Sequence, residues 1–217
     1  MKVLKGDARE LIKEVSNDAF IISDPPYNQG YHYAEYSDNL PPDDYARMLL
    51  SVFRPSKSVI IHYPEEMLAL FGGSRFAQDP PQQVVSWVYN SNTAKQHRLV
   101  TWWGCKPDFR KIPQPYKNPT DKRIAARIAA GKTARSYDWW KINQVKNVSK
   151  VDNPHPCPIP YELARRIIVS TTNKGDLVCD PFAGSGTILK AAQDLGRRVI
   201  GFDLDQSYVD YANRLLG

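Results

Sequence analysis

One continuous unit between Leu177 and Asp203 constrains the fold of this chain most strongly. Leu177–Cys179 is a short apolar run, as is typical of a parallel strand buried on both faces. A turn that contains two glycines follows, then a predicted helix over Thr187–Leu195 and a second strand over Arg198–Phe202, with Asp203 at its carboxyl end. This order predicts an open α/β sheet that holds a nucleoside at the ends of its strands.

The glycines and the acid of this unit narrow the class of ligand. Gly184 and Gly186 predict a tight turn with little side-chain bulk, which lets a ligand approach the backbone. A dinucleotide site would need a third glycine where Leu189 stands, and Asp180 would repel a pyrophosphate but attract an ammonium group. S-adenosylmethionine suits these charges, since it has an ammonium group, a ribose diol for Asp203 and no phosphate. A glycine-rich turn without a ligand is the alternative.

A second motif, Asp24-Pro25-Pro26-Tyr27, follows another short apolar strand, Ala19–Ile22. The exocyclic amino group of a base is a poor nucleophile, because its lone pair is delocalised into the ring. The Asp24 carboxylate and the Pro25 carbonyl could each accept one of its N–H groups and aim the lone pair at a methyl donor. Tyr27 offers a face for stacking a base, worth about 1–3 kcal/mol, and a base in a duplex must be flipped out to reach it. A plain turn is the alternative.

With both motifs present, the chain resembles the amino-group DNA methyltransferases, which modify adenine N6 or cytosine N4. Asp24–Tyr27 looks like their catalytic tetrapeptide and Asp180–Gly186 like their cofactor loop, in the order of the group called beta. The resemblance covers nearly the whole chain except about residues 106–152. It implies a single domain over residues 1–217, with a three-layer, doubly wound α/β fold whose sheet is mostly parallel and seven-stranded.

The resemblance also implies the roles of individual residues. Asp24, Pro25, Pro26 and Tyr27 are expected to be catalytic. Asp7 is expected to accept a hydrogen bond from the cofactor's adenine, although aspartate also favours a helix N-cap. The residues expected to bind S-adenosylmethionine are Asp7, Ala8, His155, Pro156, Asp180, Phe182, Ala183, Gly184, Ser185, Gly186, Thr187 and Asp203. Ile159 departs from the family, which usually has a lysine there, so no cofactor contact is assigned to it.

The positive charge of the chain is concentrated in one segment. The net charge is +6, but residues 106–150 carry +9 and the remainder −3, as is typical of a nucleic-acid contact surface. By resemblance this insert, about residues 106–152, holds the target-recognition segment. We expect a helix over Asp121–Ala130 capped by Thr120, and phosphate contacts from Arg123, Arg127, Lys132 and Arg135 to double-stranded DNA. A solvated basic face is the alternative. The small insert favours a short or relaxed recognition sequence.

Two loops are rich in polar or aromatic residues, and three tryptophans follow or precede them in the sequence. Asn28–Pro42 is rich in tyrosine and is interpreted either as a lid or DNA wedge or as an ordinary surface loop. Asn90–His97 joins two predicted strands, expected to pair antiparallel at the sheet edge, and by resemblance it lines the target-base pocket. The tryptophans are expected to pack in the core; they are Trp87, Trp102 and Trp103.

Composition excludes several classes of protein. Cys105, Cys157 and Cys179 are scattered, which argues for a reducing compartment and against structural zinc. No apolar run approaches the length of a membrane span, and no secretion signal is recognised. We therefore expect no metal, no membrane partner and a cytoplasmic location, in a bacterial cell or a phage-infected host. A homodimer stays open.

The sequence predicts transfer of a methyl group from S-adenosylmethionine to adenine N6 in DNA, as in restriction–modification systems. Asp24 favours adenine, because the cytosine N4 enzymes more often carry serine there; cytosine N4 is the first alternative. An RNA or protein methyltransferase is less favoured, since protein-glutamine enzymes of related fold prefer asparagine at this position. A non-catalytic DNA-binding relative would be expected to have lost Asp24 or the glycines. Pro156-Cys157 echoes cytosine C5 enzymes, but nothing else here fits them.

Overall fold

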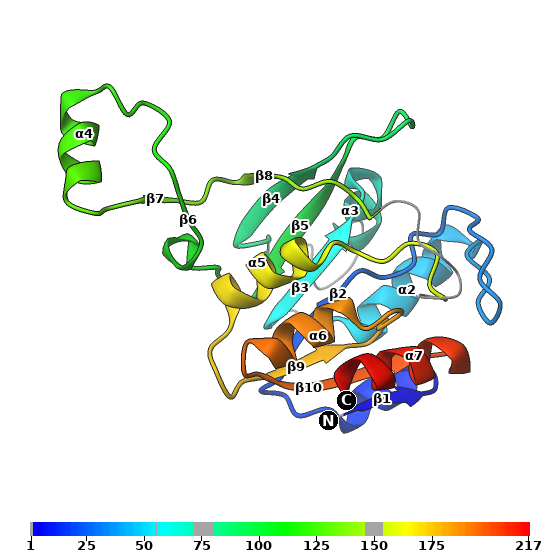
Figure 1. The fold of residues 1–217 in the computed structure, drawn as a ribbon. Coiled ribbons are helices and arrows are strands. Elements are labelled where there is room, and N and C mark those ends of the chain that lie inside the picture. The colour runs from blue at the N-terminus through cyan, green and yellow to red at the C-terminus, as the bar shows by residue number, and fades with distance from the viewer. Residues whose placement is uncertain (1, 55, 72–79, 146–153) are drawn as a thin grey trace.

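An eight-stranded sheet forms the middle layer of the computed structural model, which describes residues 2–54, 56–71, 80–145 and 154–217 (Figure 1). All neighbouring strands are parallel except at β5 (His97–Trp103), which runs antiparallel to both of its neighbours. In their order across the sheet the strands are β1 (Lys2–Lys5), β10 (Arg198–Asp203), β9 (Leu177–Asp180), β2 (Phe20–Ser23), β3 (Ser58–His62), β5 (His97–Trp103), β4 (Gln83–Val88) and β8 (Trp139–Lys141).

Helices cover both faces of the sheet, so the predicted three-layer α/β fold is confirmed. One face carries α1 (Ala8–Leu11) with the 3₁₀ turn Ile12–Glu14, and α2 (Pro42–Val52), against which α3 (Pro64–Phe71) packs. The other face carries α5 (Tyr161–Thr171), α6 (Thr187–Asp194) and α7 (Gln206–Leu216).

Alternation along the strands builds a separate apolar core on each face. In β2, Ile21 points to the core under α1 and α2, whereas Ile22 points to the core under α5 and α6. Both side chains are fully buried. Burying a side chain of this size stabilises the fold by about 1.5–3 kcal/mol. Central strands that are apolar on both faces therefore fix the sheet, and their polar residues collect at the strand ends.

The sheet has one strand more than the seven expected, and the expected antiparallel pair is not at its edge. The extra strand is β8, which comes from the insert and pairs in parallel with β4. Trp140, in this strand, is buried against Trp102 and Phe109, and its Nε1 donates a 2.9 Å hydrogen bond to the Ser136 hydroxyl. Burial of this indole explains why the insert continues the sheet instead of leaving β4 uncovered.

The middle of the insert projects from the body as an arm, defined here as residues 113–135 (Figure 1). It contains the two-stranded ribbon of β6 (Pro113–Gln114) and β7 (Ala134–Arg135), with α4 (Lys122–Ala129) beyond it. The expected cap was wrong by one residue: Asp121, not Thr120, is the N-cap, and its side chain accepts from the backbone N–H groups of Arg123 and Ile124. α4 buries none of its residues against the described part of the chain.

Other helix boundaries lie close to expectation. The apolar spacing of residues 8–15 predicts a helix over Ala8–Val15, but α1 ends at Leu11 and continues as the 3₁₀ turn. Gly72-Gly73 predicts the end of α3, and these two glycines lie outside the described residues. No helix in the described ranges is long and apolar enough to cross a membrane.

Candidate active site

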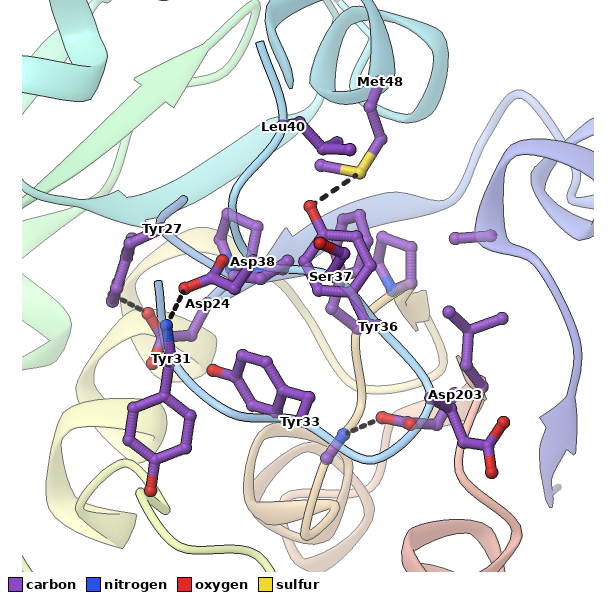
Figure 2. A pocket seen from close by; sticks show the side chains of 18 of the residues that line it. Asp24, Tyr27, Tyr31, Tyr33, Tyr36, Ser37, Asp38, Leu40, Met48 and Asp203 are labelled. Carbon is purple, nitrogen blue, oxygen red and sulfur yellow. Dashed lines mark hydrogen bonds between the residues drawn. The ribbon is translucent and has the colours of Figure 1, made fainter. Parts of the chain in front are cut away.

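A cavity of about 1060 Å³ opens at the carboxyl ends of the parallel strands (Figure 2). Three acids from three strand ends line it: Asp7 after β1, Asp24 after β2 and Asp203 at the end of β10. A small hollow of about 30 Å³ also involves Asp24 and contains Asp180, at the end of β9. Small-molecule pockets usually measure about 300–1,000 Å³, so the cavity lies at the upper end of that range.

Asp24 is paired with a buried arginine. Its side chain is 15% exposed, and Oδ2 lies 3.5 Å from Nη1 of Arg98. The hydroxyl of Tyr27 donates to its other oxygen, Oδ1 (Figure 2). Burial raises the pKa of Asp24 to about 7, and the positive charge of Arg98 opposes that rise. The Arg98 charge therefore favours the ionised form of Asp24, which burial disfavours.

The Asp-Pro-Pro-Tyr turn is held from the neighbouring helix. Tyr45, buried in α2, donates a 3.0 Å hydrogen bond from its hydroxyl to the Pro26 carbonyl. Tyr27 packs against Tyr63 with ring centroids 5.0 Å apart. The two prolines have fixed φ and lack backbone donors, so these contacts leave the turn little freedom.

Asp180 forms the inner end of the site. It is 2% exposed, and its Oδ1 accepts hydrogen bonds from the Ser23 hydroxyl at 2.5 Å and from the Phe182 N–H at 3.2 Å. Burial raises its pKa to about 7, and these hydrogen bonds oppose the rise. A carboxyl group buried this deeply favours a cationic partner.

Asp203 joins the glycine-rich turn to the cavity. Its Oδ2 accepts from the Gly184 N–H at 2.8 Å and its Oδ1 from the Asp205 N–H at 3.0 Å. Gly184 has φ of +50°, and a Cβ there would lie 2.9 Å from the ring of His155. The turn therefore needs glycine at this position both for its backbone conformation and for contact with the imidazole.

His155 and Asp7 are fixed by their neighbours. Burial lowers the pKa of His155 to about 4, so the ring is neutral at pH 7, and it packs edge-on against Tyr208 at 4.9 Å. Asp7 is the N-cap of α1, as the alternative interpretation held, and also lines the cavity. Its hydrogen bonds with Arg9 lower its pKa.

The tyrosine-rich loop Asn28–Pro42 lines one side of the cavity. Asp38, 3% exposed, accepts hydrogen bonds of 2.7–3.0 Å from the backbone N–H groups of Asn28, Gln29 and Tyr31. Three tyrosines of the loop line the cavity, as Figure 2 shows; they are Tyr31, Tyr33 and Tyr36. The start of the loop is therefore tied to the buried Asp38 carboxylate beside the site.

The structure brings most of the predicted cofactor residues to the two cavities, but not all of them. Pro156 and Gly186 line neither cavity as far as the chain is described. Gly186, at φ of +76°, is the N-cap of α6, and a Cβ there would lie 2.8 Å from the Cβ of Ala212. Its role is close packing of α6 on α7. The predicted residues found at the cavities are Asp7, Ala8, His155, Asp180, Phe182, Ala183, Gly184, Ser185, Thr187 and Asp203.

The four predicted DNA contacts lie on the arm, away from the cavity (Figure 1). All four side chains are exposed; they are Arg123, Arg127, Lys132 and Arg135. Sequence reasoning missed the residues that surround the Asp-Pro-Pro-Tyr turn, namely Tyr45, Tyr63 and Arg98. None of them belongs to a local motif, so only the tertiary fold reveals them. In the described ranges, no group of three or more His, Cys, Asp or Glu side chains could hold a metal ion.

Comparison with known proteins gives a consistent picture. The family model described as DNA methylase, which covers N6 and N4 enzymes, matches residues 19–214. The type II methyltransferase M.BglII of Bacillus subtilis is 24% identical over 254 residues, which covers 99% of this chain and 68% of that protein. The DNA adenine methyltransferase YhdJ of Escherichia coli (strain K12) is 32% identical over 130 residues, 59% of this chain and 37% of that protein.

Solved structures share the fold. The PvuII DNA methyltransferase, described as cytosine-N4-specific, superimposes with a TM-score of 0.69 at 18% identity, over 99% of this chain and 85% of that one. The M1.HpyAVI–SAM complex gives a TM-score of 0.59 at 21% identity, over 98% of each chain. The family match and this complex support S-adenosylmethionine as the cofactor. Because the family match includes both motifs and spans the strands that position them, the chain belongs to the N6/N4 family of DNA methyltransferases.

Proposed function

We propose that this protein transfers the methyl group of S-adenosylmethionine to adenine N6 in double-stranded DNA. The observation that carries the proposal is the meeting of Asp24 and Asp203 in one cavity, with Asp180 in the hollow beside them. Three carboxylates from three neighbouring strand ends can serve an amine acceptor, a ribose and an ammonium group at once. The arm and the loops around the cavity then belong to the DNA side of the same domain.

The residues at the cavity fit the cofactor. Asp203 is oriented by two backbone N–H groups and can accept from the ribose hydroxyls. Asp180 is a buried carboxyl group whose Oδ1 accepts from Ser23 and Phe182, and it can face an ammonium group. S-adenosylmethionine supplies an electrophilic methyl group attached to a positively charged sulfur.

The chain's own contribution is to present the amino group of the base. The Asp24 carboxylate and the Pro25 carbonyl are the proposed acceptors for its two N–H groups, and the Tyr27 ring is the proposed stacking face. The Tyr27 hydroxyl donates to Asp24 in this structure, so the incoming amino group must replace it there. Positioning and polarisation of one nitrogen account for the catalysis.

Removing the Tyr45 hydroxyl should slow methyl transfer without weakening cofactor binding. Tyr45→Phe deletes the hydrogen bond to the Pro26 carbonyl while retaining the ring in the core. We expect the single-turnover rate to fall about twofold to tenfold, because one hydrogen bond of about 0.5–1.5 kcal/mol holds the turn. An unchanged rate in a correctly folded variant would show that the turn needs no support from α2.

Neutralising Asp203 should weaken the cofactor. Asp203→Asn keeps an acceptor for one backbone N–H but loses the charge. We expect the dissociation constant for S-adenosylmethionine, measured by calorimetry, to rise about tenfold to a hundredfold, since hydrogen bonds to charged groups contribute about 1.5–3 kcal/mol. Asp194→Asn is the matched control, because Asp194 pairs with Lys190 at the exposed end of α6 and lines neither cavity. Equal affinities for S-adenosylmethionine in both variants would show that Asp203 does not bind the cofactor.

The arm is proposed to grip the backbone of the duplex while the target base is flipped into the cavity. A DNA-modifying enzyme of this kind works where bacterial or phage DNA is accessible, so we propose a cytoplasmic location and a role in modification alongside restriction.

Cytosine N4 is the second candidate target. The similarity of this fold to the cytosine-N4-specific PvuII enzyme favours it. The adenine-specific relative YhdJ and the aspartate at position 24 favour adenine. Both bases present an exocyclic amino group, so the same two acceptors would serve either.

Nucleoside analysis separates these outcomes. Unmethylated plasmid DNA, an RNA transcript and a denatured protein mixture are each incubated with the enzyme and methyl-labelled cofactor. The proposal expects label in duplex DNA, recovered as N6-methyladenine, and mapping of the modified positions gives the sequence context. Recovery of N4-methylcytosine would transfer the assignment to cytosine, and label in RNA or protein alone would overturn it.

A further inference from the structure

We propose that Arg98 is a positioning residue that keeps the Asp24 carboxylate ionised and oriented for the amino group of the base. The inference rests on the proposed function, in which Asp24 is the acceptor. Arg98 lies at the start of β5, opposite Trp87 of β4, and its residue is 9% exposed. It lines the same cavity as Asp24, from the side opposite the cofactor residues of β9 and β10.

Aromatic rings surround the guanidinium of Arg98. Its central carbon lies 4.8 Å from the ring centroid of Tyr27, 5.1 Å from that of Tyr63 and 5.2 Å from that of Trp87. Tyr89 lies at 6.0 Å. Ring faces attract cations and partly offset the loss of water around a buried charge. The rings thus hold a cation in place without neutralising it, and its field remains available to Asp24.

The bonding of Arg98 differs from that of an arginine that ties the backbone together. Arg197, 8% exposed, donates from Nε, Nη1 and Nη2 to the Thr172 hydroxyl and to the carbonyls of Leu195 and Thr172, at 2.6–2.9 Å. In Arg98, Nε is buried without a hydrogen-bond partner in the described structure, and Nη1 lies 3.5 Å from Asp24. This arrangement favours an electrostatic role for Arg98 beside the Asp24 carboxylate.

The groups that face Asp24 make Arg98 the important charge. Asp180 on β9 is a like charge, Tyr33 of the loop lines the cavity with Asp24, and the Tyr45 hydroxyl of α2 donates to the Pro26 carbonyl in the same turn. The Tyr27 hydroxyl donates to Asp24 from the same turn, and Cys157 lines the small hollow that Asp24 shares with Asp180. His155 also lines it but is neutral at pH 7, because burial lowers its pKa to about 4. Three other cations line the large cavity, but each pairs with another acid: Arg9 with Asp7, Arg47 with Asp44 and Lys95 with Glu65. In the described residues only Arg98 pairs with Asp24.

Loss of this cation has a defined sign. Burial already raises the pKa of Asp24 to about 7 against the opposing charge of Arg98, so removal of Arg98 raises the pKa further. Only the ionised Asp24 carboxylate has the charge and the free oxygen needed to accept an N–H of the base. Activity therefore falls as the pH drops through the pKa of Asp24. Removing the cation therefore moves the acidic limb of the pH profile to higher pH, by about one to three units for an ion pair at this distance.

The test compares Arg98→Met and Arg98→Lys on duplex DNA, after both are shown to fold and to bind S-adenosylmethionine. For Arg98→Met we expect about tenfold or greater loss of the single-turnover rate at pH 7, partly recovered at higher pH as the limb shifts. Arg98→Lys keeps the charge and should keep the wild-type limb. If Arg98→Met does not fold, Arg98→Gln takes its place. Arg197→Met, which removes a buried arginine far from the cavity, should lower stability and leave the limb unmoved.

A direct readout does not depend on turnover. Titration of ¹³C-aspartate-labelled protein without DNA should show the Asp24 carboxyl titrating at higher pH in Arg98→Met than in wild type. An unchanged Asp24 titration, or a rate loss equal at every pH, would overturn the inference. A wild-type protein that methylates no DNA, with the Asp24 titration still shifted, would instead contradict the proposed function and leave the Arg98–Asp24 coupling standing.

Discussion

Asp24→Asn should lower the single-turnover rate of DNA methylation by at least about a hundredfold and leave cofactor binding within about twofold of wild type. The amide is nearly isosteric, so the turn and its contact with Arg98 keep their shape. The asparagine side chain lacks the negative charge that increases electron density on the attacking nitrogen. Catalytic groups of this kind typically contribute 10²–10⁴-fold, as an order of magnitude, to enzymatic rates. Quench-flow measurement with saturating cofactor and duplex gives the rate directly.

The matched control is Asp18→Asn, because the side chain of Asp18 is 96% exposed and lies outside the cavity. Its rate should equal that of wild type. If Asp24→Asn and Asp24→Ala both retained wild-type rates with normal folding, another acceptor would hold the amino group, and the catalytic role of Asp24 would be wrong.

Removing four positive charges from the arm should reduce DNA affinity by about a hundredfold or more at moderate salt and leave cofactor affinity unchanged. The variant replaces Arg123, Arg127, Lys132 and Arg135 together with alanine. All four side chains are exposed on the arm, two of them on α4, and no residue of α4 is buried in the described structure. Each phosphate that the arm no longer neutralises should reduce the slope of log affinity against log salt by about 0.9. For all four side chains together, the slope should therefore change by about 3 to 4.

A second quadruple variant controls for net charge alone. It replaces four exposed basic residues on the body with alanine, namely Lys2, Lys13, Lys174 and Arg214. Fluorescence anisotropy on one duplex over a salt series compares the two. Equal reductions of affinity and slope in both variants would mean that the arm is a solvated basic face and that DNA binds elsewhere.

The central fold could be predicted because its signals are local. The bounds of β9, α6 and β10 differ from expectation by a single residue each, since buried apolar runs and glycines mark every boundary. β8 could not be predicted, because Trp139–Lys141 is short and its partner strand lies more than fifty residues earlier in the chain. Pairing at that separation depends on tertiary burial of Trp140 and leaves no periodic signal.

The candidate site likewise contains residues that the sequence predicts and residues that only the fold reveals. Asp7, Asp24 and Asp203 could be brought together from sequence, because the carboxyl ends of parallel strands share one edge of a sheet. Gly186 was grouped with Gly184 by motif, yet packing against Ala212 explains it. Arg98 comes from a strand without a motif, and its importance depends on four rings and one acid that only the fold assembles.

A crystal structure of the protein with S-adenosylhomocysteine and a duplex carrying the methylated sequence tests the central claim most directly. The account predicts a flipped base on Tyr27, its exocyclic nitrogen within hydrogen-bond distance of Asp24, and the cofactor ribose on Asp203. A cofactor bound away from Asp203, or a flipped base whose amino group faces neither Asp24 nor the Pro25 carbonyl, would contradict it.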